Sequence, residues 1–461
     1  MPHSELQKQR KQGYLDQHQL HYDEIVSYLD NNWKTSTAKN MQQINAVFSN
    51  IAHKTPTITI TGTSGKSTTI HYLTELLKTE NLTVGVFSSP HFNTYNERFS
   101  YNNNLICQET FTKLANKVIN TIKKDNINAS THEILTTMAL LYFQEKKVDV
   151  AILEQQHLDE YDPTTICAPT IIGITRIVIT DEIKRNEVIK SFFKDIKPQT
   201  YVTSGDQSKI LLHKIATLTE ESACQWIMPI RKLAPLPYPY EQLHGRCAAL
   251  AERIAQTYIE TALKHQPVNK NSLLRTSKKQ RGRPRLTAKQ QLLKQPTNNT
   301  IEYFWNHVST SIPNRFQIIK QKQSTVLLDT AHNIDALQNL LLGIRLLNYQ
   351  QPFKNIFFIV SAYNNELNPH EFIKTIRYFF KKNPGTLTLC LPTTDNLSIK
   401  TSSWNIDKFL TSAHHAKIKV TTYENFQVAF HSVSKQLHDP QDLLVITGSH
   451  TIISEYWNQK N

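Results

Sequence analysis

A glycine-containing loop at residues 62–68 has the residue types that hold a phosphate group. It is formed by Gly62, Thr63, Ser64, Gly65, Lys66, Ser67 and Thr68. Glycines let the backbone bend close to an anion, backbone N–H groups and a helix start point at phosphate oxygens, and the lysine adds positive charge. Ile60 replaces the first glycine of the longer GxxxxGK[ST] pattern, so this is a compact version. We predict a nucleoside triphosphate site. The alternative is a Gly/Ser turn with an incidental lysine.

The segments on both sides of the loop predict a strand before it and a helix after it. Residues 57–61 form a β-branched run after Pro56, which is typical of a buried strand. After the loop, apolar residues recur at helical spacing, at Ile70, Leu73, Leu76 and Leu77. This order of strand, glycine loop and helix is what a phosphate site requires.

A carboxylate follows a second predicted strand. Residues 148–153, VDVAIL, predict a strand that ends at Glu154. A carboxylate beside a triphosphate is most simply a magnesium ligand. The alternative is a solvated glutamate at a strand end. With the strands at 82–87 and 171–174, this alternation of strands and helices favours a mostly parallel sheet whose carboxyl strand ends carry the site.

Length and pattern predict an α/β protein of two domains. A chain of 461 residues is too long for a single core. We expect a P-loop ATPase domain with a mostly parallel sheet at residues 1–306, and a smaller Rossmann-like α/β domain at 307–461. The second begins after Pro313-Asn314-Arg315-Phe316 and has strands near 326–328, 356–360, 387–391, 418–420 and 443–446.

Composition sets the compartment and the range of partners. Five cysteines without CxxC spacing and a polar N-terminus predict a reducing, cytoplasmic location. No apolar run approaches the roughly 18 residues of a membrane span, so we expect no membrane partner. The net charge of +14 is concentrated in residues 270–294, which carry nine Lys or Arg and no acid.

The basic residues lie in a segment, 266–298, that we expect to be a disordered insertion. Residues 278–285 read KKQRGRPR, and the Arg-Gly-Arg-Pro core resembles an AT-hook, which can lie in a narrow A·T minor groove. The alternative is a soluble loop without a nucleic-acid role.

Seven motifs together resemble the folylpolyglutamate synthase / dihydrofolate synthase family, relatives of the Mur ligases. They occur in the family's order across nearly the whole chain. They are GTSGKST at 62–68, SPH at 89–91, NER at 96–98, Glu154 after VDVAIL, PNRF at 313–316, DTAHN at 329–333 and TGS at 447–449.

The resemblance implies an ATP-dependent amide ligase. Such an enzyme passes the γ-phosphate of ATP to a substrate carboxylate, and the amino group of L-glutamate then attacks the acyl phosphate. The implied cofactors are ATP and Mg²⁺, and the implied substrates are dihydropteroate or a folate together with L-glutamate. We expect a monomer.

The family motifs also imply residue roles. Lys66, Glu154 and Asp181 would be catalytic, and Ser89, Glu154 and Asp181 would hold metal. The nucleotide would be bound by the loop together with Arg315, Asp329 and His332. The substrate would be contacted by His91, Arg98 and Asp162.

Plainer roles remain open for four of these residues. Asp329 could cap the helix that begins near Ile334. His91 and His332 could be packed structural histidines, and Arg98 a structural ion-pair partner.

The chain departs from the family after Glu154. The family's loop GLGGRLDATN is replaced by residues 155–165, QQHLDEYDPTT, which keep Asp162 and Thr164 but no glycine. The family's second-metal histidine aligns with Asp181. Its carbamylated lysine aligns with Phe192, two residues from Lys190 and from Lys194. One alternative is therefore a degenerate homologue that binds ATP without efficient ligation. Another is a nucleic-acid-associated protein that uses residues 278–285.

Overall fold

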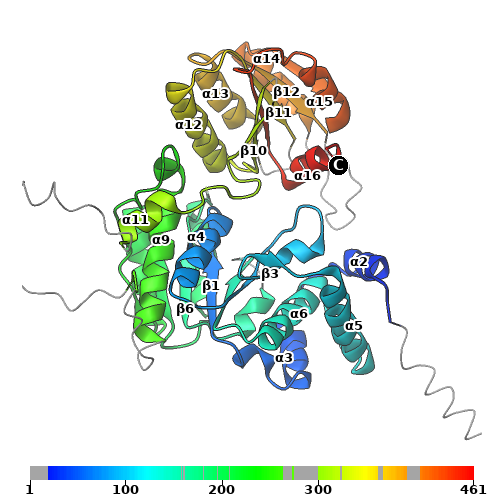
Figure 1. Cartoon of the computed structure of the whole chain (residues 1–461), viewed down its shortest axis with the longest axis vertical. Coiled ribbons are helices and arrows are strands. Elements are labelled where there is room, and N and C mark those ends of the chain that lie inside the picture. Colours follow the sequence, from blue (N-terminus) through cyan, green and yellow to red (C-terminus); the bar gives the residue numbers. More distant parts are fainter. Residues whose placement is uncertain are drawn as a thin grey trace, which may run out of the picture.

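Two sheets with flanking helices lie one above the other (Figure 1). The computed structural model describes residues 19–156, 158, 161–179, 181–194, 196–206, 208–262, 272–274, 300–321, 324–361, 367–391 and 405–460. The lower lobe contains α2 (Tyr22–Asp30), α3 (Ala38–Val47), β1 (Thr57–Thr61), α4 (Lys66–Thr79), β2 (Val84–Phe87), β3 (Phe99–Tyr101), β4 (Asn104–Leu105), α5 (Gln108–Lys124), α6 (Thr131–Lys146), β5 (Val150–Glu154), β6 (Ile171–Ile174), α7 (Glu182–Lys194), β7 (Tyr201–Ser204), α8 (Lys209–Glu221), β8 (Gln225–Trp226), α9 (Tyr240–Thr261) and α11 (Ile301–His307). The upper lobe contains β9 (Gln317–Lys320), β10 (Thr325–Asp329), α12 (Ile334–Gln350), β11 (Ile356–Val360), α13 (Pro369–Phe380), β12 (Gly385–Cys390), α14 (Ile406–Ala416), β13 (Val420–Tyr423), α15 (Phe426–Ser434), β14 (Leu443–Thr447) and α16 (His450–Asn458).

The lower sheet is mostly parallel, with its strands in the order β4-β3-β2-β5-β1-β6-β7-β8. Only β3 and β4 run antiparallel to their neighbours. β1 is central and pairs with β5 and β6, which places the loop after β1 beside the ends of both. All five residues of β1 are buried, as the β-branched run predicts. The prediction of an α/β fold is confirmed.

Helices cover both faces of the lower sheet. On one face, Ile58 and Ile60 of β1 pack with residues of α4 and α9. On the other face, Leu153 of β5 packs with α5 and α6, and α6 is buried along most of its length. Because side chains alternate across a strand, this double burial explains the continuous apolar runs seen in the sequence.

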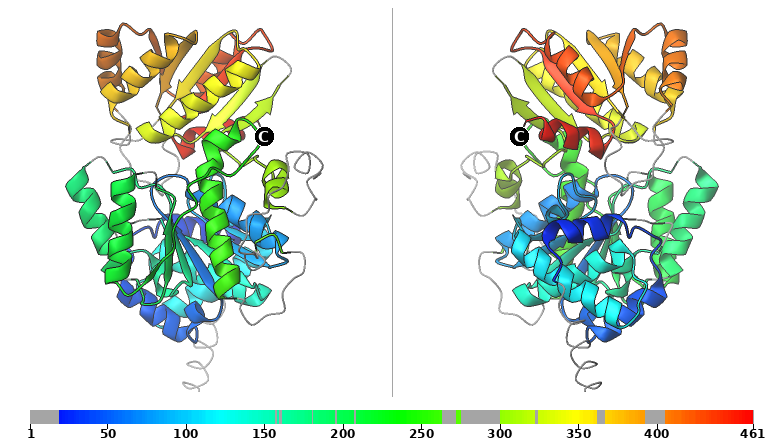
Figure 2. Two further views of the ribbon diagram at one scale, coloured as in Figure 1. Left: turned by 90° about the vertical axis from the view of Figure 1, so that its left-hand side faces the viewer. Right: turned by 90° about the vertical axis from the view of Figure 1, so that its right-hand side faces the viewer.

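The upper sheet has the order β13-β12-β11-β14-β10-β9, and only β9 is antiparallel. Helices α12, α13 and α14 cover one face, and α15 and α16 cover the other (Figure 2). β10 ends at Asp329 next to Thr447 of β14. The carboxyl ends of these two strands thus lie together.

The chain passes from the hydrophobic core of the lower lobe to that of the upper lobe between Ile312 and Phe316. Ile312 packs in the lower core with α9 and α11, whereas Phe316 packs in the upper core. The boundary between residues 306 and 307 falls near the end of α11 and stays a prediction. The AT-hook-like residues 278–285 lie outside the described residues. Along the part of the chain that is described, no helix has the length and apolar character needed to cross a membrane.

Candidate active site

The phosphate loop leaves β1 through a backbone bend that requires glycine. Gly62 has φ +121°, and a Cβ there would lie 2.2 Å from the Thr175 hydroxyl. Gly65 has φ +89°, and a Cβ there would lie 2.8 Å from Cys247 Sγ. Both positions combine the left-handed backbone region with a close neighbour, so a side chain would be strained at either. Helix α4 starts directly afterwards, at Lys66.

Arg176, which follows β6, holds the first part of the loop. Its carbonyl accepts hydrogen bonds from the backbone N–H groups of Thr63 and Ser64, at 3.0 and 3.1 Å, and from the Thr63 hydroxyl. In this conformation these two N–H groups are therefore engaged by Arg176, and the prediction that loop N–H groups point at phosphate oxygens stays a prediction. The start of α4 is the part of the loop that remains for phosphate oxygens, and a helix N-terminus favours an anion.

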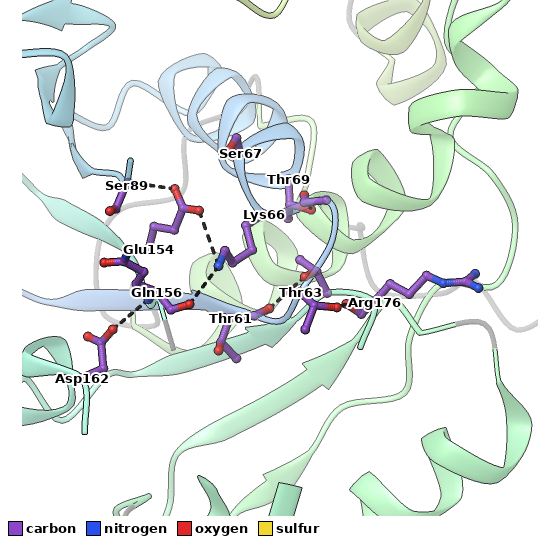
Figure 3. A network of polar contacts seen from close by, with 12 residues as sticks. Thr61, Thr63, Lys66, Ser67, Thr69, Ser89, Glu154, Gln156, Asp162 and Arg176 are labelled. Atoms are coloured by element: carbon purple, nitrogen blue, oxygen red, sulfur yellow. Dashed lines mark hydrogen bonds and ion pairs between the residues drawn. The ribbon is translucent and has the colours of Figure 1, made fainter. Parts of the chain in front are cut away.

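Lys66, Glu154 and Ser89 form one polar network at the ends of three neighbouring segments (Figure 3). Lys66 Nζ lies 3.9 Å from Glu154 Oε1 and donates to the Gln156 carbonyl at 3.4 Å. The Ser89 N–H donates to Glu154 Oε2 at 3.2 Å. Glu154 is only 2% exposed. Burial raises the pKa of the Glu154 carboxyl, and Lys66 opposes that effect.

The loop after Glu154 is organised by Asp162 instead of by glycines. The Asp162 carboxylate accepts hydrogen bonds from the N–H of Gln156 at 2.8 Å and from the N–H and hydroxyl of Thr164. Asp162 is fully buried and is not among the residues that line the cavity described below. Its position therefore does not fit the predicted substrate contact. It fixes Gln156, whose carbonyl in turn meets Lys66.

Arg98 forms a second polar cluster with residues of the segment that follows β2. Its Nε donates to His91 Nδ1 at 2.8 Å and its Nη1 to the Ser89 hydroxyl at 2.9 Å. The guanidinium also lies 5.4 Å from the Trp33 ring and 5.6 Å from the Tyr95 ring. Burial and the neighbouring Arg98 lower the pKa of His91 to about 3. His91 is thus a neutral acceptor, and Arg98 donates hydrogen bonds to it and to Ser89.

The upper lobe contributes Arg315, Asp329 and His332. Arg315 Nη2 reaches the Ser67 hydroxyl of the phosphate loop at 3.5 Å. Asp329 accepts from the Phe316 N–H at 2.8 Å, and burial raises its pKa to about 6. Helix α12 is capped by Asn333, so the alternative role of Asp329 as the cap is not the one observed. His332 Nδ1 is 3.0 Å from the Thr330 carbonyl, and burial lowers its pKa.

One cavity of about 1090 Å³ between the lobes collects most of these residues. Its wall includes all seven loop residues, together with the predicted site residues Ser89, His91, Arg98, Glu154, Arg315, Asp329 and His332. Residues that the sequence did not single out also line it, among them Trp33, Arg176 and Asp335. Arg176 and Asp335 form an ion pair of 2.8 Å between the lobes. Their only signal in the sequence is position, one after a predicted strand and one in the DTAHN helix.

The residues assigned to a second metal do not meet at this cavity. Asp181 is exposed, and its carboxylate accepts from the N–H groups of Ile183 and Lys184, which makes it a cap of α7. Phe192 is buried against other apolar residues, and Lys190 and Lys194 are exposed on the same helix. Within the described residues, no group of three or more His, Cys, Asp or Glu is arranged to hold a metal ion. The catalytic and metal-binding roles predicted for Asp181 find no support in this geometry.

Comparison with known proteins first defines the class. Searches against family models found no match. By structure, the chain resembles a folylpolyglutamate synthase of Mycobacterium tuberculosis solved with ADP, with a TM-score of 0.73 and 15% identity over 95% of this chain and 98% of that one. It also resembles a bifunctional folylpolyglutamate synthase/dihydrofolate synthase of Yersinia pestis, with a TM-score of 0.71 and 18% identity over 96% and 98%. The fold is therefore that of these two-lobed α/β proteins.

Sequence similarity points to the same family. A dihydrofolate synthase/folylpolyglutamate synthase of Bacillus subtilis is 24% identical over 408 residues, which is 84% of this chain and 91% of that protein. The bovine mitochondrial folylpolyglutamate synthase is 28% identical over 304 residues, and the match spans about half of that relative, 49%. The resemblance to the folylpolyglutamate synthase / dihydrofolate synthase family is confirmed.

Proposed function

We propose that this protein is an ATP-dependent amide ligase that joins L-glutamate to dihydropteroate, to a folate, or to both. The observation that carries the proposal is the single cavity in which the phosphate loop, the Lys66–Glu154 pair and Arg315 of the other lobe meet. Relatives that match most of this chain are named dihydrofolate synthase/folylpolyglutamate synthase or folylpolyglutamate synthase. We further propose that it acts as a monomer in the cytoplasm.

The residues fit a polyphosphate chain and one divalent ion. The buried hydroxyl of Ser64 in the loop has no hydrogen-bond partner among the described residues, and the same holds for Thr61 at the end of β1. Lys66 and Arg315 supply positive charge from two lobes. Glu154 and the Ser89 hydroxyl are oxygen donors of the kind that magnesium takes. A bound magnesium ion would offset the charge that builds up on the phosphate oxygens.

The chemistry requires these charges at two stages. A carboxylate is a poor electrophile, so it first attacks the γ-phosphorus of ATP and becomes an acyl phosphate, while ADP leaves. The amine of glutamate then attacks the acyl carbon, and phosphate leaves. Negative charge accumulates in both steps, and Lys66, Arg315 and the start of α4 would stabilise it.

Nucleotide-dependent turnover tests the proposal. Purified protein is given ATP, magnesium and L-glutamate with either dihydropteroate or tetrahydrofolate, and ADP release is followed while the product is identified by mass. We expect ADP release that requires both the acceptor and glutamate, and a product heavier by one glutamate residue. Nucleotide binding without turnover on either acceptor would favour the degenerate homologue instead. A parallel titration with A·T duplex tests the role of residues 278–285.

A further inference from the structure

His450 is a histidine at the cavity to which none of the roles above applies. It is the first residue of α16 and follows the cap Ser449. It lines the cavity on the side of the upper lobe, and its ring lies 4.9 Å from the ring of Phe92 in the lower lobe. Its Nδ1 atom is buried and has no hydrogen-bond partner among the described residues. A buried polar atom without a partner calls for one from a ligand or from closure of the lobes.

The surroundings of His450 keep its ring neutral. Burial is the main reason that its pKa is well below the usual value, and the cations and histidines facing it act in the same direction. These are Arg315, which precedes β9, His332 after β10, His91 after β2 and Lys66 at the start of α4. In the tautomer that carries its hydrogen on Nε2, the Nδ1 atom offers a lone pair. Nδ1 is thus a buried acceptor in a wall that also contains the cations Lys66 and Arg315.

Resting on the ligase function proposed above, we propose that His450 is a catalytic residue whose Nδ1 takes the proton of the attacking amine. The amino group of bound glutamate arrives as an ammonium and gives one proton to His450 Nδ1, and the free amine then attacks the acyl carbon, so a C–N bond forms. The C–O bond to phosphate breaks, and phosphate leaves with that electron pair and takes up the second proton that the nitrogen loses. The imidazolium gives its proton to the released phosphate, which returns the ring to its neutral state.

The charge of the substrates makes this transfer feasible. In the ligand-free cavity, the cations disfavour a charged imidazole. The triphosphate and the acyl phosphate bring negative charge to the same place and so oppose that effect. The phosphorylated substrate therefore makes a proton on His450 more favourable than it is in the ligand-free cavity. This order suits a base that must not be protonated before the amine arrives.

Two nucleophiles separate this role from simple packing against Phe92. Glutamate needs a proton acceptor, whereas hydroxylamine is a strong nucleophile that is largely unprotonated at neutral pH and traps the acyl phosphate as a hydroxamate. The variants are His450→Leu and His450→Gln. His431→Gln is the matched control, because His431 is exposed on α15. Each protein is assayed with ATP, magnesium and dihydropteroate or tetrahydrofolate, with either nucleophile, across pH.

We expect both His450 variants to lose about a hundredfold in glutamate-dependent turnover, the usual range for a general base, and to keep hydroxamate formation within about twofold. The pH dependence of the glutamate reaction should also change in these variants and not in His431→Gln. Equal losses with both nucleophiles, or no loss with either, would overturn the role of His450. If the parent protein forms neither amide nor hydroxamate, the ligase function itself fails, and the role of His450 fails with it.

Discussion

Two places along the carboxyl edge of the lower sheet differ in what their side chains contact. At the ends of β2 and β5, Ser89 and Glu154 contact each other, Glu154 lies against Lys66, and all three line the cavity. After β6, Asp181 caps a helix and Phe192 is packed in an apolar cluster. The side chains at the first place are of the kinds that bind phosphate and metal. Those at the second place cap a helix and pack it against its neighbours. We therefore expect one metal ion where the family resemblance implies two.

The largest effect on turnover should come from changing Lys66, at the site formed by the ends of β2 and β5. Lys66→Ala removes the positive charge that faces the phosphate and leaves Glu154 buried without its ion-pair partner. We expect acceptor-dependent ADP release to fall by about 10²–10³-fold, as for the loss of one group that stabilises transition-state charge. Steady-state kinetics measure the loss.

The control is Lys78→Ala, because Lys78 lies on the same helix in its last turn and pairs with Glu75. It should behave like the parent. Parental turnover in Lys66→Ala would mean that the loop does not bind the phosphate.

A smaller effect should come from the arginine that crosses between the lobes. Arg315→Ala removes a donor near Ser67 and the cation beside Asp329. We expect kcat/KM for ATP to fall by about tenfold to hundredfold, which corresponds to the roughly 1.5–3 kcal/mol of a hydrogen bond to a charged group. The exposed Arg377→Ala, on α13, serves as the control. An unchanged kcat/KM in Arg315→Ala would place the nucleotide elsewhere.

Nucleotide affinity should depend on pH through Asp329. Burial raises its pKa to about 6, so the carboxylate gains its charge as pH rises through that value. Donors on a bound nucleotide favour the charged form, so binding releases a proton and affinity rises with pH until it levels off above about 6. Calorimetry of parent and Asp329→Asn measures this dependence.

The comparison with the variant is needed because the nucleotide titrates as well. Asp329→Asn should bind more weakly above pH 6 and lose the part of the pH dependence that Asp329 supplies. Identical pH profiles for the two proteins would remove Asp329 from the nucleotide site.

The smallest effect on activity should come from the second place. Asp181→Ala removes the cap of α7 and no cavity-lining group. We expect turnover within about twofold of the parent and a free energy of unfolding lower by about 1 kcal/mol, the typical value of an N-cap. Kinetics and urea unfolding measure these two quantities. A loss of activity beyond tenfold without loss of stability would restore a second metal at Asp181.

Much of the fold followed from local sequence, and the motifs named most of the predicted site residues that line the cavity. The strands at 57–61, 171–174 and 356–360 were predicted at their observed bounds, because continuous apolar runs mark strands that are buried on both faces. The strands β3, β4, β7 and β8 and the edge strand β9 were missed. β7 is buried but only four residues long, and the others are short, polar or half-exposed. Such strands depend on their neighbours more than on their own residues.

The rest of the site depends on contacts that sequence patterns do not encode. The role of Arg176 is carried by its backbone carbonyl, which any residue type would supply. Trp33 reaches the cavity from the segment after α2, far from the motifs in the chain. Asp162 keeps its place in a family motif but faces its own loop. The order of the motifs predicted which residues lie near the cavity. The packing of their side chains decides which of these residues line it.

Oxygen transfer from the acceptor tests the central claim most directly. The acceptor is prepared with ¹⁸O in its carboxylate and is converted with ATP, magnesium and glutamate, and the released phosphate is analysed by mass. If the cavity around Lys66 and Glu154 forms an acyl phosphate, each phosphate released in turnover carries one oxygen from the acceptor. Phosphate that contains oxygen from water and none from the acceptor would contradict this account.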